Sequence, residues 1–265
     1  MSKFNSPQFV EHFFKEIYRI LRDTDKKVNE IWYERSEIPN LKGLNKFELS
    51  EFLGNFDFIE IKRGNHIDYI AIDKVLFVAD AIQYLEIELK KLSELLDFNG
   101  FEALIQEILL RNEYKVIKNF RFSDKSNFKS KTSQTRYEVD VIGFNRKYIL
   151  VIDAKQWRRK DSFSSMNKAA NLQYQRVVAL KKNPNAFSEL IHEVLGFNVN
   201  IKKNLPYKLI PMMVSIEDNG IRLNEKQVPL VSISNFNTFL QEFYKYVDNY
   251  KTINISKVSI QTRLL

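Results

Sequence analysis

Two aspartates and a lysine have the residue types and the spacing to hold a metal ion and to act on a phosphate. Asp140 precedes a tight turn predicted at residues 145–146, and Asp153 and Lys155 follow that turn. The flanking segments alternate apolar and polar residues, which predicts an antiparallel hairpin that brings Asp140 close to Asp153. Two adjacent carboxylates repel each other, and a divalent cation such as Mg²⁺ or Mn²⁺ removes that conflict. Lys155 shares a strand face with Asp153, where its ammonium could orient a water or neutralise a phosphate.

The rest of the composition excludes several other chemistries. The chain contains no cysteine, so it has no disulfide framework, no zinc finger, no thiol nucleophile and no iron–sulfur cluster. Its three histidines, His12, His66 and His192, share no metal-ligand spacing. It has seven glycines, and they form no Walker-type or dinucleotide-binding loop. Oxygen ligands are therefore the credible ligands for a metal in this chain.

The element that must carry Asp153 is a strand buried on both faces. Residues 148–152 read Tyr-Ile-Leu-Val-Ile, which is typical of a central strand in a sheet. This strand is predicted over residues 147–155. Further strands are predicted over residues 114–122, 137–144, 207–216 and 228–234, and helices over residues 101–112, 164–182, 185–195 and 235–247. This order favours an α/β fold in which a mixed central sheet is flanked by helices.

The first 97 residues show a different pattern. Helices are expected over residues 7–22, 25–35, 44–54 and 74–96, and two alternating segments over residues 56–62 and 67–73 predict a hairpin. Helices followed by a hairpin indicate a mainly helical, winged-helix-like domain. We therefore predict two domains, residues 1–97 and residues 98–265.

The ordered acidic residues resemble the motif of the PD-(D/E)xK nuclease superfamily, whose members share the restriction-endonuclease-like fold. Asp140, twelve intervening residues and then Asp153–Ala154–Lys155 match the motif order. The helix that begins near residue 99, with the strand after it, is similar to the first elements of Mrr-type nucleases and archaeal Holliday-junction resolvases. Val139 replaces the proline of the family name, and Asp153 replaces the more usual glutamate. The resemblance covers about residues 99–182.

This resemblance implies metal-dependent hydrolysis of phosphodiester bonds. It assigns the metal ion to four residues: Asp140, Asp153, Glu102 of the preceding helix, and Ala154 through its carbonyl. Lys155 would position the attacking water or stabilise the charge that develops on phosphorus. Gln173, on the helix after the lysine strand, matches a polar site position that these families often carry.

Each of these residues also has a purely structural interpretation. Asp140 and Asp153 could cap strand ends or pair with neighbouring basic side chains. Glu138 lies on the same strand face as Asp140 and is its main competitor for the metal site. Glu102 could simply complement the dipole of its helix from the first turn, and Gln173 could be a hydrogen-bonded amide in the core.

Positive charge is concentrated around the predicted site. The net charge of the chain is +8, but residues 111–182 alone carry +12, whereas residues 1–97 carry −4. Six basic residues lie in a polar loop or directly after the lysine strand, and these are the predicted DNA-binding residues: Lys125, Lys129, Lys131, Arg158, Arg159 and Lys160. Long cationic side chains around a carboxylate cluster suit a phosphate backbone.

Together these features predict a Mg²⁺-dependent DNA endonuclease, with Mn²⁺ as an alternative ion. Restriction or Mrr-like cleavage and structure-specific cleavage both remain open. The alternative from another class is a catalytically inactive DNA-binding or assembly protein with a nuclease-like fold. No segment approaches roughly 18 uninterrupted apolar residues, and the N-terminus lacks the apolar core of a signal peptide, so we expect a cytoplasmic protein with no membrane partner. Cleavage of both DNA strands usually needs two active sites, which favours a homodimer.

Overall fold

The structure, a computed structural model, describes residues 6–64, 67–85, 89–123, 136–156, 163–196, 205–216 and 221–258. The chain divides into two compact units, residues 1–107 and residues 108–265. The division falls inside helix α6 (Phe98–Arg111). The domain boundary predicted between residues 97 and 98 stays a prediction.

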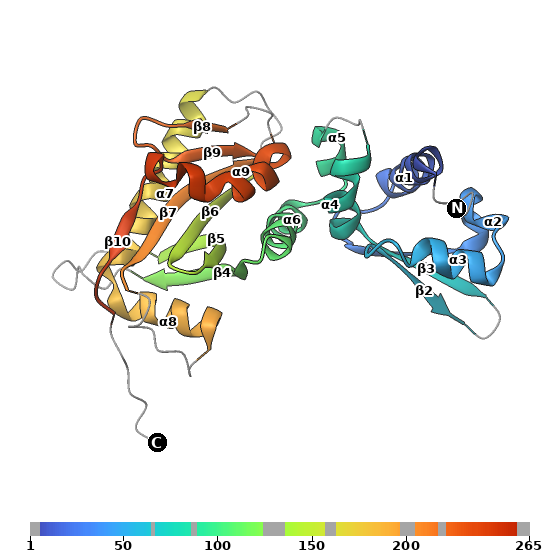
Figure 1. The fold of residues 1–265 in the computed structure, drawn as a ribbon, viewed down its shortest axis with the longest axis horizontal. Coiled ribbons are helices and arrows are strands. Elements are labelled where there is room, and N and C mark those ends of the chain that lie inside the picture. The colour runs from blue at the N-terminus through green and yellow to red at the C-terminus, as the bar shows by residue number, and fades with distance from the viewer. Residues whose placement is uncertain are drawn as a thin grey trace, which may run out of the picture. The chain divides into compact units, whose positions relative to one another are not determined.

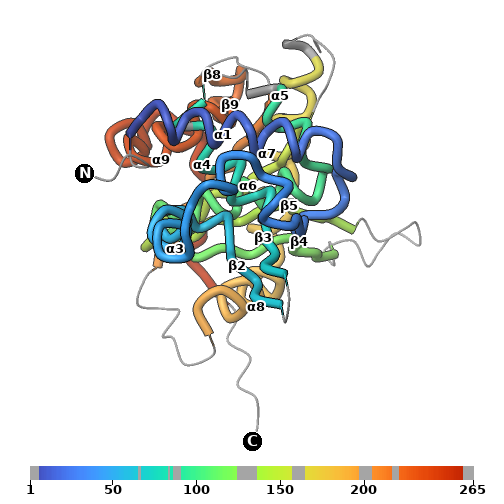
Figure 2. Tube along the Cα trace, turned by 90° about the vertical axis from the view of Figure 1, so that its right-hand side faces the viewer, coloured from blue at the N-terminus to red at the C-terminus, as the bar shows by residue number. Residues whose placement is uncertain are grey.

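The first unit combines helices with a small antiparallel sheet (Figures 1 and 2). Its elements are α1 (Pro7–Arg22), β1 (Glu30–Glu34), the 3₁₀ turn η2 (Arg35–Glu37), α2 (Pro39–Lys42), α3 (Lys46–Leu53), β2 (Ile59–Arg63), β3 (Asp68–Asp73), α4 (Lys74–Tyr84) and α5 (Leu89–Ser93). Among the described residues its sheet has three strands in the order β1-β3-β2. Helices followed by the β2–β3 hairpin keep the pattern on which the winged-helix-like prediction rests.

Aromatic side chains form the core of this unit. Helix α1 begins after Ser6, whose hydroxyl accepts a backbone N–H of the first turn, and it buries Phe13 and Phe14. The ring of Phe13 lies edge-on to that of Phe52 from α3, with 5.0 Å between the centroids. The ring of Phe14 stacks on that of Phe77 from α4 at 5.7 Å. Aromatic rings bury a large apolar area each, and such pairs stabilise a small core.

Two of the helices predicted for this unit are wrong. Residues 25–35 do not form a helix, because Glu30–Glu34 is strand β1 and pairs with β3 along its whole length. The partner strand is distant in sequence, and local periodicity does not register such pairing. The helix predicted over residues 74–96 is divided, because α4 ends where the buried Leu85 takes an extended backbone conformation, and α5 follows as a separate helix.

The second unit is built on a mixed sheet. Among the described residues this sheet has seven strands, in the order β4-β5-β6-β7-β9-β8 with β10 paired to β7. The strands are β4 (Lys115–Ser123), β5 (Arg136–Asn145), β6 (Tyr148–Lys155), β7 (Tyr207–Ser215), β8 (Ile221–Leu223), β9 (Pro229–Ser232) and β10 (Ile253–Ile255). After α6, the helices are α7 (Phe163–Lys182), α8 (Pro184–Leu195), α9 (Ile233–Tyr246) and the 3₁₀ turn η4 (Val247–Asn249). The predicted α/β fold with a mixed sheet flanked by helices is confirmed.

Strand β6 is the central strand of this sheet. It pairs antiparallel with β5 on one edge and parallel with β7 on the other. Each β6 side chain from Tyr148 to Ala154 is buried, as predicted for a strand that is apolar on both faces. Asp153 and Lys155 therefore lie at the carboxyl end of the innermost strand.

Helices cover both faces of this sheet (Figure 1). On one face, α7 packs through Val177 into a core that includes Val151 of β6. On the other face, Phe243 of α9 lies edge-on to Tyr148, with 5.4 Å between the ring centroids. Because strand side chains alternate, Asp153 points to the same face as Val151, toward α7. None of the helices in the described residues is both long and apolar enough to cross a membrane.

Candidate active site

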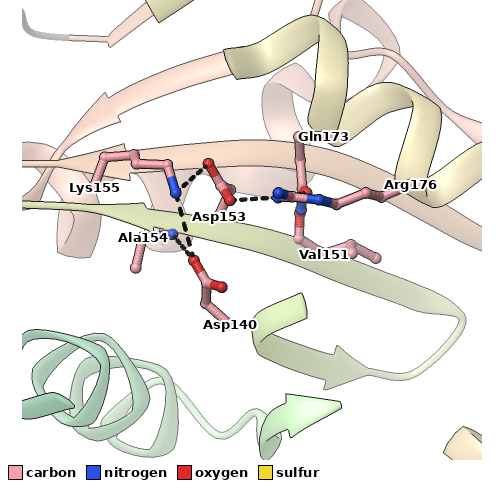
Figure 3. A network of polar contacts seen from close by, with 7 residues as sticks. All are labelled: Asp140, Val151, Asp153, Ala154, Lys155, Gln173 and Arg176. Carbon is pink, nitrogen blue, oxygen red and sulfur yellow. Dashed lines mark hydrogen bonds and ion pairs between the residues drawn. The ribbon is translucent and has the colours of Figure 1, made fainter. Parts of the chain in front are cut away.

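The β5–β6 hairpin brings the two predicted carboxylates together at one end of the sheet (Figure 3). Its strand pairing runs from the turn as far as Val141 opposite Ile152. One residue further on, Asp140 replaces the backbone partner, because its Oδ2 accepts the N–H of Ala154 at 2.8 Å. On β4, at the position that the register would pair with Asp140, Asn119 takes a left-handed φ of 55°. The backbone thus departs from regular pairing beside Asp140, whose side chain turns toward β6.

Asp153 is buried, and two cationic side chains bind its carboxylate. Its side chain is 1% exposed. Lys155 Nζ lies 3.0 Å from Oδ2, and Nη1 of Arg176 from α7 lies 2.5 Å from Oδ1. A buried carboxylate is stable only when it is paired and hydrogen-bonded. Each oxygen of Asp153 has its own cationic partner.

Lys155 connects the two carboxylates. Its Nζ lies 3.0 Å from Asp153 Oδ2 and 4.0 Å from Asp140 Oδ2. The two acidic side chains therefore converge on a single point, which the ammonium occupies (Figure 3). The side chains of Lys155 and Asp140 are 25% and 14% exposed, so this point is accessible from solvent.

Gln173 is fully buried and orients the second cation. Its Nε2 donates to the carbonyl oxygen of Val151 on β6 at 2.7 Å. Its Oε1 accepts from Nη1 of Arg176 at 3.2 Å. Gln173 is thus a hydrogen-bonded core amide that also reaches the site through Arg176.

Burial raises the pKa of the Asp140 carboxyl above its ordinary value, and the negative charge of Asp153 raises that pKa further. The N–H of Ala154 and the charges of Lys155 and Arg176 act in the opposite direction, because they stabilise the ionised form. The pKa remains raised in total. A cation placed between the two carboxylates would remove the repulsion that contributes to this shift.

The donor set fits a divalent cation that takes most of its ligands from water and substrate. Among the residues that the structure describes, no group of three or more His, Cys, Asp or Glu side chains could hold a metal ion. Asp140 and Asp153 are thus a pair, and Mg²⁺ is usually bound by one or two carboxylates together with waters and phosphate oxygens. The convergence of both side chains on Lys155 Nζ marks a place where positive charge is stabilised.

The other residues predicted or considered for the site divide into three cases. Glu102 is buried in α6 and belongs to the first compact unit, so its place in a metal site stays a prediction. Glu138, the competitor of Asp140, forms an exposed ion pair with Arg121 at 2.9 Å. The six predicted DNA-binding residues lie outside the described residues: Lys125, Lys129, Lys131, Arg158, Arg159 and Lys160.

Arg176 is the member of the network that the sequence did not predict. It follows Gln173 by three residues, so both side chains lie on one face of α7. The spacing Gln-x-x-Arg on the helix after the Asp-x-Lys strand was the available signal. Residues 111–182 carry a net charge of +12, and in such a segment a single arginine does not stand out.

Comparison with known families agrees with this geometry. Residues 97–209 match the family described as NERD, the nuclease-related domain. This segment, which is less than half of the chain, resembles a nuclease-related domain. The match runs from α6 into β7 and contains Asp140, Asp153 and Lys155. The predicted relationship to the PD-(D/E)xK nucleases is confirmed for the nuclease-related domain.

Comparison with solved structures and curated proteins adds no functional argument. The crystal structure of protein VC1899 from Vibrio cholerae aligns at 10% sequence identity with a TM-score of 0.32. The alignment covers 92% of this chain and 51% of that protein, so this chain spans about half of its length. No curated protein matches the chain.

Proposed function

We propose that the protein is a metal-dependent DNA endonuclease that uses Mg²⁺ and accepts Mn²⁺. The observation that carries this proposal is the convergence of Asp140 and Asp153 on Lys155 within the nuclease-related domain. Two carboxylates supply the oxygen ligands that these ions prefer. A lysine beside them supplies the positive charge that favours a negatively charged transition state.

The roles of the side chains follow from their positions. Asp140 and Asp153 would hold the ion, with the carbonyl of Ala154 as a further proposed ligand. When bound, the ion would polarise the scissile phosphate and lower the pKa of a water molecule. Lys155 Nζ is partly exposed and lies between the two carboxylates, where it can donate to the attacking water or to a phosphate oxygen.

The proposed substrate follows from the charge distribution. Residues 111–182 contain the site and carry a net charge of +12. A polyanionic backbone is the ligand that such a segment attracts, whereas residues 1–97, with a net charge of −4, attract it less. We therefore take DNA as both partner and substrate, and a homodimer as the form that cleaves both strands.

Plasmid cleavage by the full chain tests this proposal. Supercoiled plasmid should become nicked or linear with Mg²⁺ or Mn²⁺ and should stay intact in EDTA. Asp248→Asn, which alters an exposed aspartate of η4, should cleave like the wild type. Comparison with a four-way junction distinguishes structure-specific cleavage from restriction-like cleavage. Bound but intact DNA in every metal and DNA form would instead support the catalytically inactive DNA-binding protein.

A further inference from the structure

Arg176 and Lys155 bind different carboxylate oxygens of Asp153. Lys155 Nζ lies 3.0 Å from Oδ2, and Arg176 Nη1 lies 2.5 Å from Oδ1. The Asp-x-Lys motif accounts for the lysine but assigns no role to this arginine. The carboxylate that is proposed to hold a metal ion is thus already bound by two protein cations.

The position of Arg176 is defined from two sides. Its Nη1 donates to Asp153 and also to Oε1 of Gln173. Nε2 of Gln173 in turn donates to the carbonyl of Val151. The side chain of Arg176 is 28% exposed, whereas that of Asp153 is 1% exposed. The guanidinium therefore extends from a buried carboxylate to the solvent, where a phosphate oxygen can reach it.

Electrostatic repulsion makes the position of the Arg176 guanidinium incompatible with a divalent cation bound to Asp153. The network in Figure 3 contains two carboxylates and two cations, so it is neutral when all four groups are ionised. An ion on Asp153 would add two positive charges within a few ångströms of the guanidinium, and such charges repel strongly at a partly buried site. A DNA phosphate offers the guanidinium another partner, because arginine binds phosphate in a bidentate manner.

We propose that Arg176 is a positioning residue that occupies Asp153 in the metal-free protein and transfers its guanidinium to a DNA phosphate when the ion binds. This inference rests on the proposed function, because it takes Asp153 as a metal ligand. It couples the two binding events, since Arg176 weakens metal binding until DNA is present, and each ligand strengthens the binding of the other by the same factor. The ion is therefore bound mainly when nucleic acid is there to be cut.

Mn²⁺ binding to the full chain without DNA, followed by electron paramagnetic resonance of the free ion, tests the competition. Arg176→Met should lower the dissociation constant for Mn²⁺ about tenfold, because one charge-assisted partner of Asp153 is removed. Arg176→Lys should lower it less, because lysine keeps the positive charge but lacks the planar guanidinium. Arg222→Met, which alters an exposed arginine of β8, should leave the constant unchanged.

Asp153→Asn separates the failure of this inference from the failure of the proposed function. If Asp153→Asn loses Mn²⁺ while both Arg176 variants bind no more tightly than the wild type, the competition is refuted and the metal site stands. If the wild type and all variants fail to bind Mn²⁺, both proposals are refuted. A cleavage-resistant phosphorothioate duplex should tighten Mn²⁺ binding more in the wild type than in Arg176→Met, and an equal gain would overturn the coupling.

Discussion

At the scale of single residues, the site is a pair of carboxylates whose mutual repulsion is offset by basic neighbours. The charge of Asp153 contributes to the raised pKa of Asp140, and Lys155 and Arg176 reduce that rise without cancelling it. Removing any one of the neighbouring charges changes the preference of Asp140 for a proton. The protonation behaviour of Asp140 is therefore a direct measure of how the site is arranged.

Replacing Asp140 by asparagine should increase the free energy of unfolding at neutral pH. The pKa of Asp140 is higher in the folded protein than in the unfolded chain, so protonated Asp140 favours the folded state and ionised Asp140 favours the unfolded state. The free energy of unfolding of the wild type therefore falls as the pH rises from about 4 through the native pKa. The oxygen of an asparagine can still accept the N–H of Ala154. Urea unfolding at a series of pH values measures this effect. The free energy of unfolding of Asp140→Asn should exceed that of the wild type by a difference that grows toward neutral pH.

The matched control for that experiment is Asp248→Asn, an exposed aspartate in the same unit. It should change the free energy of unfolding by little, because its side chain is exposed. An Asp140→Asn variant whose advantage shrank as the pH rose would contradict the raised pKa of Asp140.

At the scale of elements, helix α7 is joined to strand β6 by a polar bridge in an otherwise apolar interface. Val177 and Ala170 are fully buried in α7, and Gln173 lies between them with no exposure. The hydrogen bond from Gln173 to Val151 fixes the helix against the central strand, and Gln173 also accepts from Arg176, which binds Asp153. Packing and site geometry thus depend on the same side chain.

Gln173→Leu should lower the free energy of unfolding by about 1–3 kcal/mol, because it leaves the buried carbonyl of Val151 without its side-chain donor and removes the Gln173 acceptor from Arg176. Gln241→Leu, on the exposed side of α9, should cost less than about 0.5 kcal/mol. Urea unfolding followed by circular dichroism measures both. A Gln173→Leu variant as stable as the Gln241→Leu variant would show that the bridge contributes nothing to stability.

Elements whose own residues carry the pattern could be predicted from the sequence. The β5–β6 hairpin and the buried strand that holds Asp153 were predictable because alternation and apolar runs are local signals. Strand β1 was missed because its conformation depends on pairing with β3, and the short strands β8 and β10 depend likewise on β9 and β7. Pairing between distant segments has no local signature in one sequence.

The candidate site likewise has a part that could be predicted from the sequence and a part that could not. The pairing of Asp140 with Asp153 and Lys155 could be predicted from a turn and a two-residue period. The place of Arg176 could not, because it depends on how α7 lies across β6 and on a hydrogen bond from Gln173. The angle at which α7 crosses β6 is set by side-chain packing, and the helical pattern of α7 does not specify that packing.

At the scale of the whole chain, charge is divided unevenly along the sequence. Residues 1–97 carry a net charge of −4 and residues 111–182 carry +12, so the nuclease-related domain holds most of the attraction for a polyanion. Binding of this kind depends on counterion release and weakens steeply with salt. If the proposed DNA binding occurs, comparing its salt dependence between variants of the two units identifies the unit that makes the contacts.

Replacing the basic cluster after β6 by alanine should weaken DNA binding and make it less dependent on salt. For the triple variant of Arg158, Arg159 and Lys160, the slope of log K against log salt should become shallower by about 2–3, since each phosphate contact contributes about 0.9. Fluorescence anisotropy with a labelled duplex in EDTA measures this without cleavage. The matched control is a triple alanine variant of exposed lysines in the acidic first unit: Lys27, Lys42 and Lys46. An equal loss of slope in both variants would contradict the proposed DNA-binding surface.

The most direct test of the central claim is single-turnover cleavage of a labelled duplex by Asp153→Asn, with protein in excess and Mg²⁺ present. Asparagine has nearly the same shape as aspartate but removes the charge that is proposed to hold the ion. We expect the cleavage rate to fall at least about 100-fold, while binding to the same duplex in EDTA stays within about threefold of the wild type. An Asp153→Asn variant that binds DNA and cleaves it at the wild-type rate would contradict the assignment of this site.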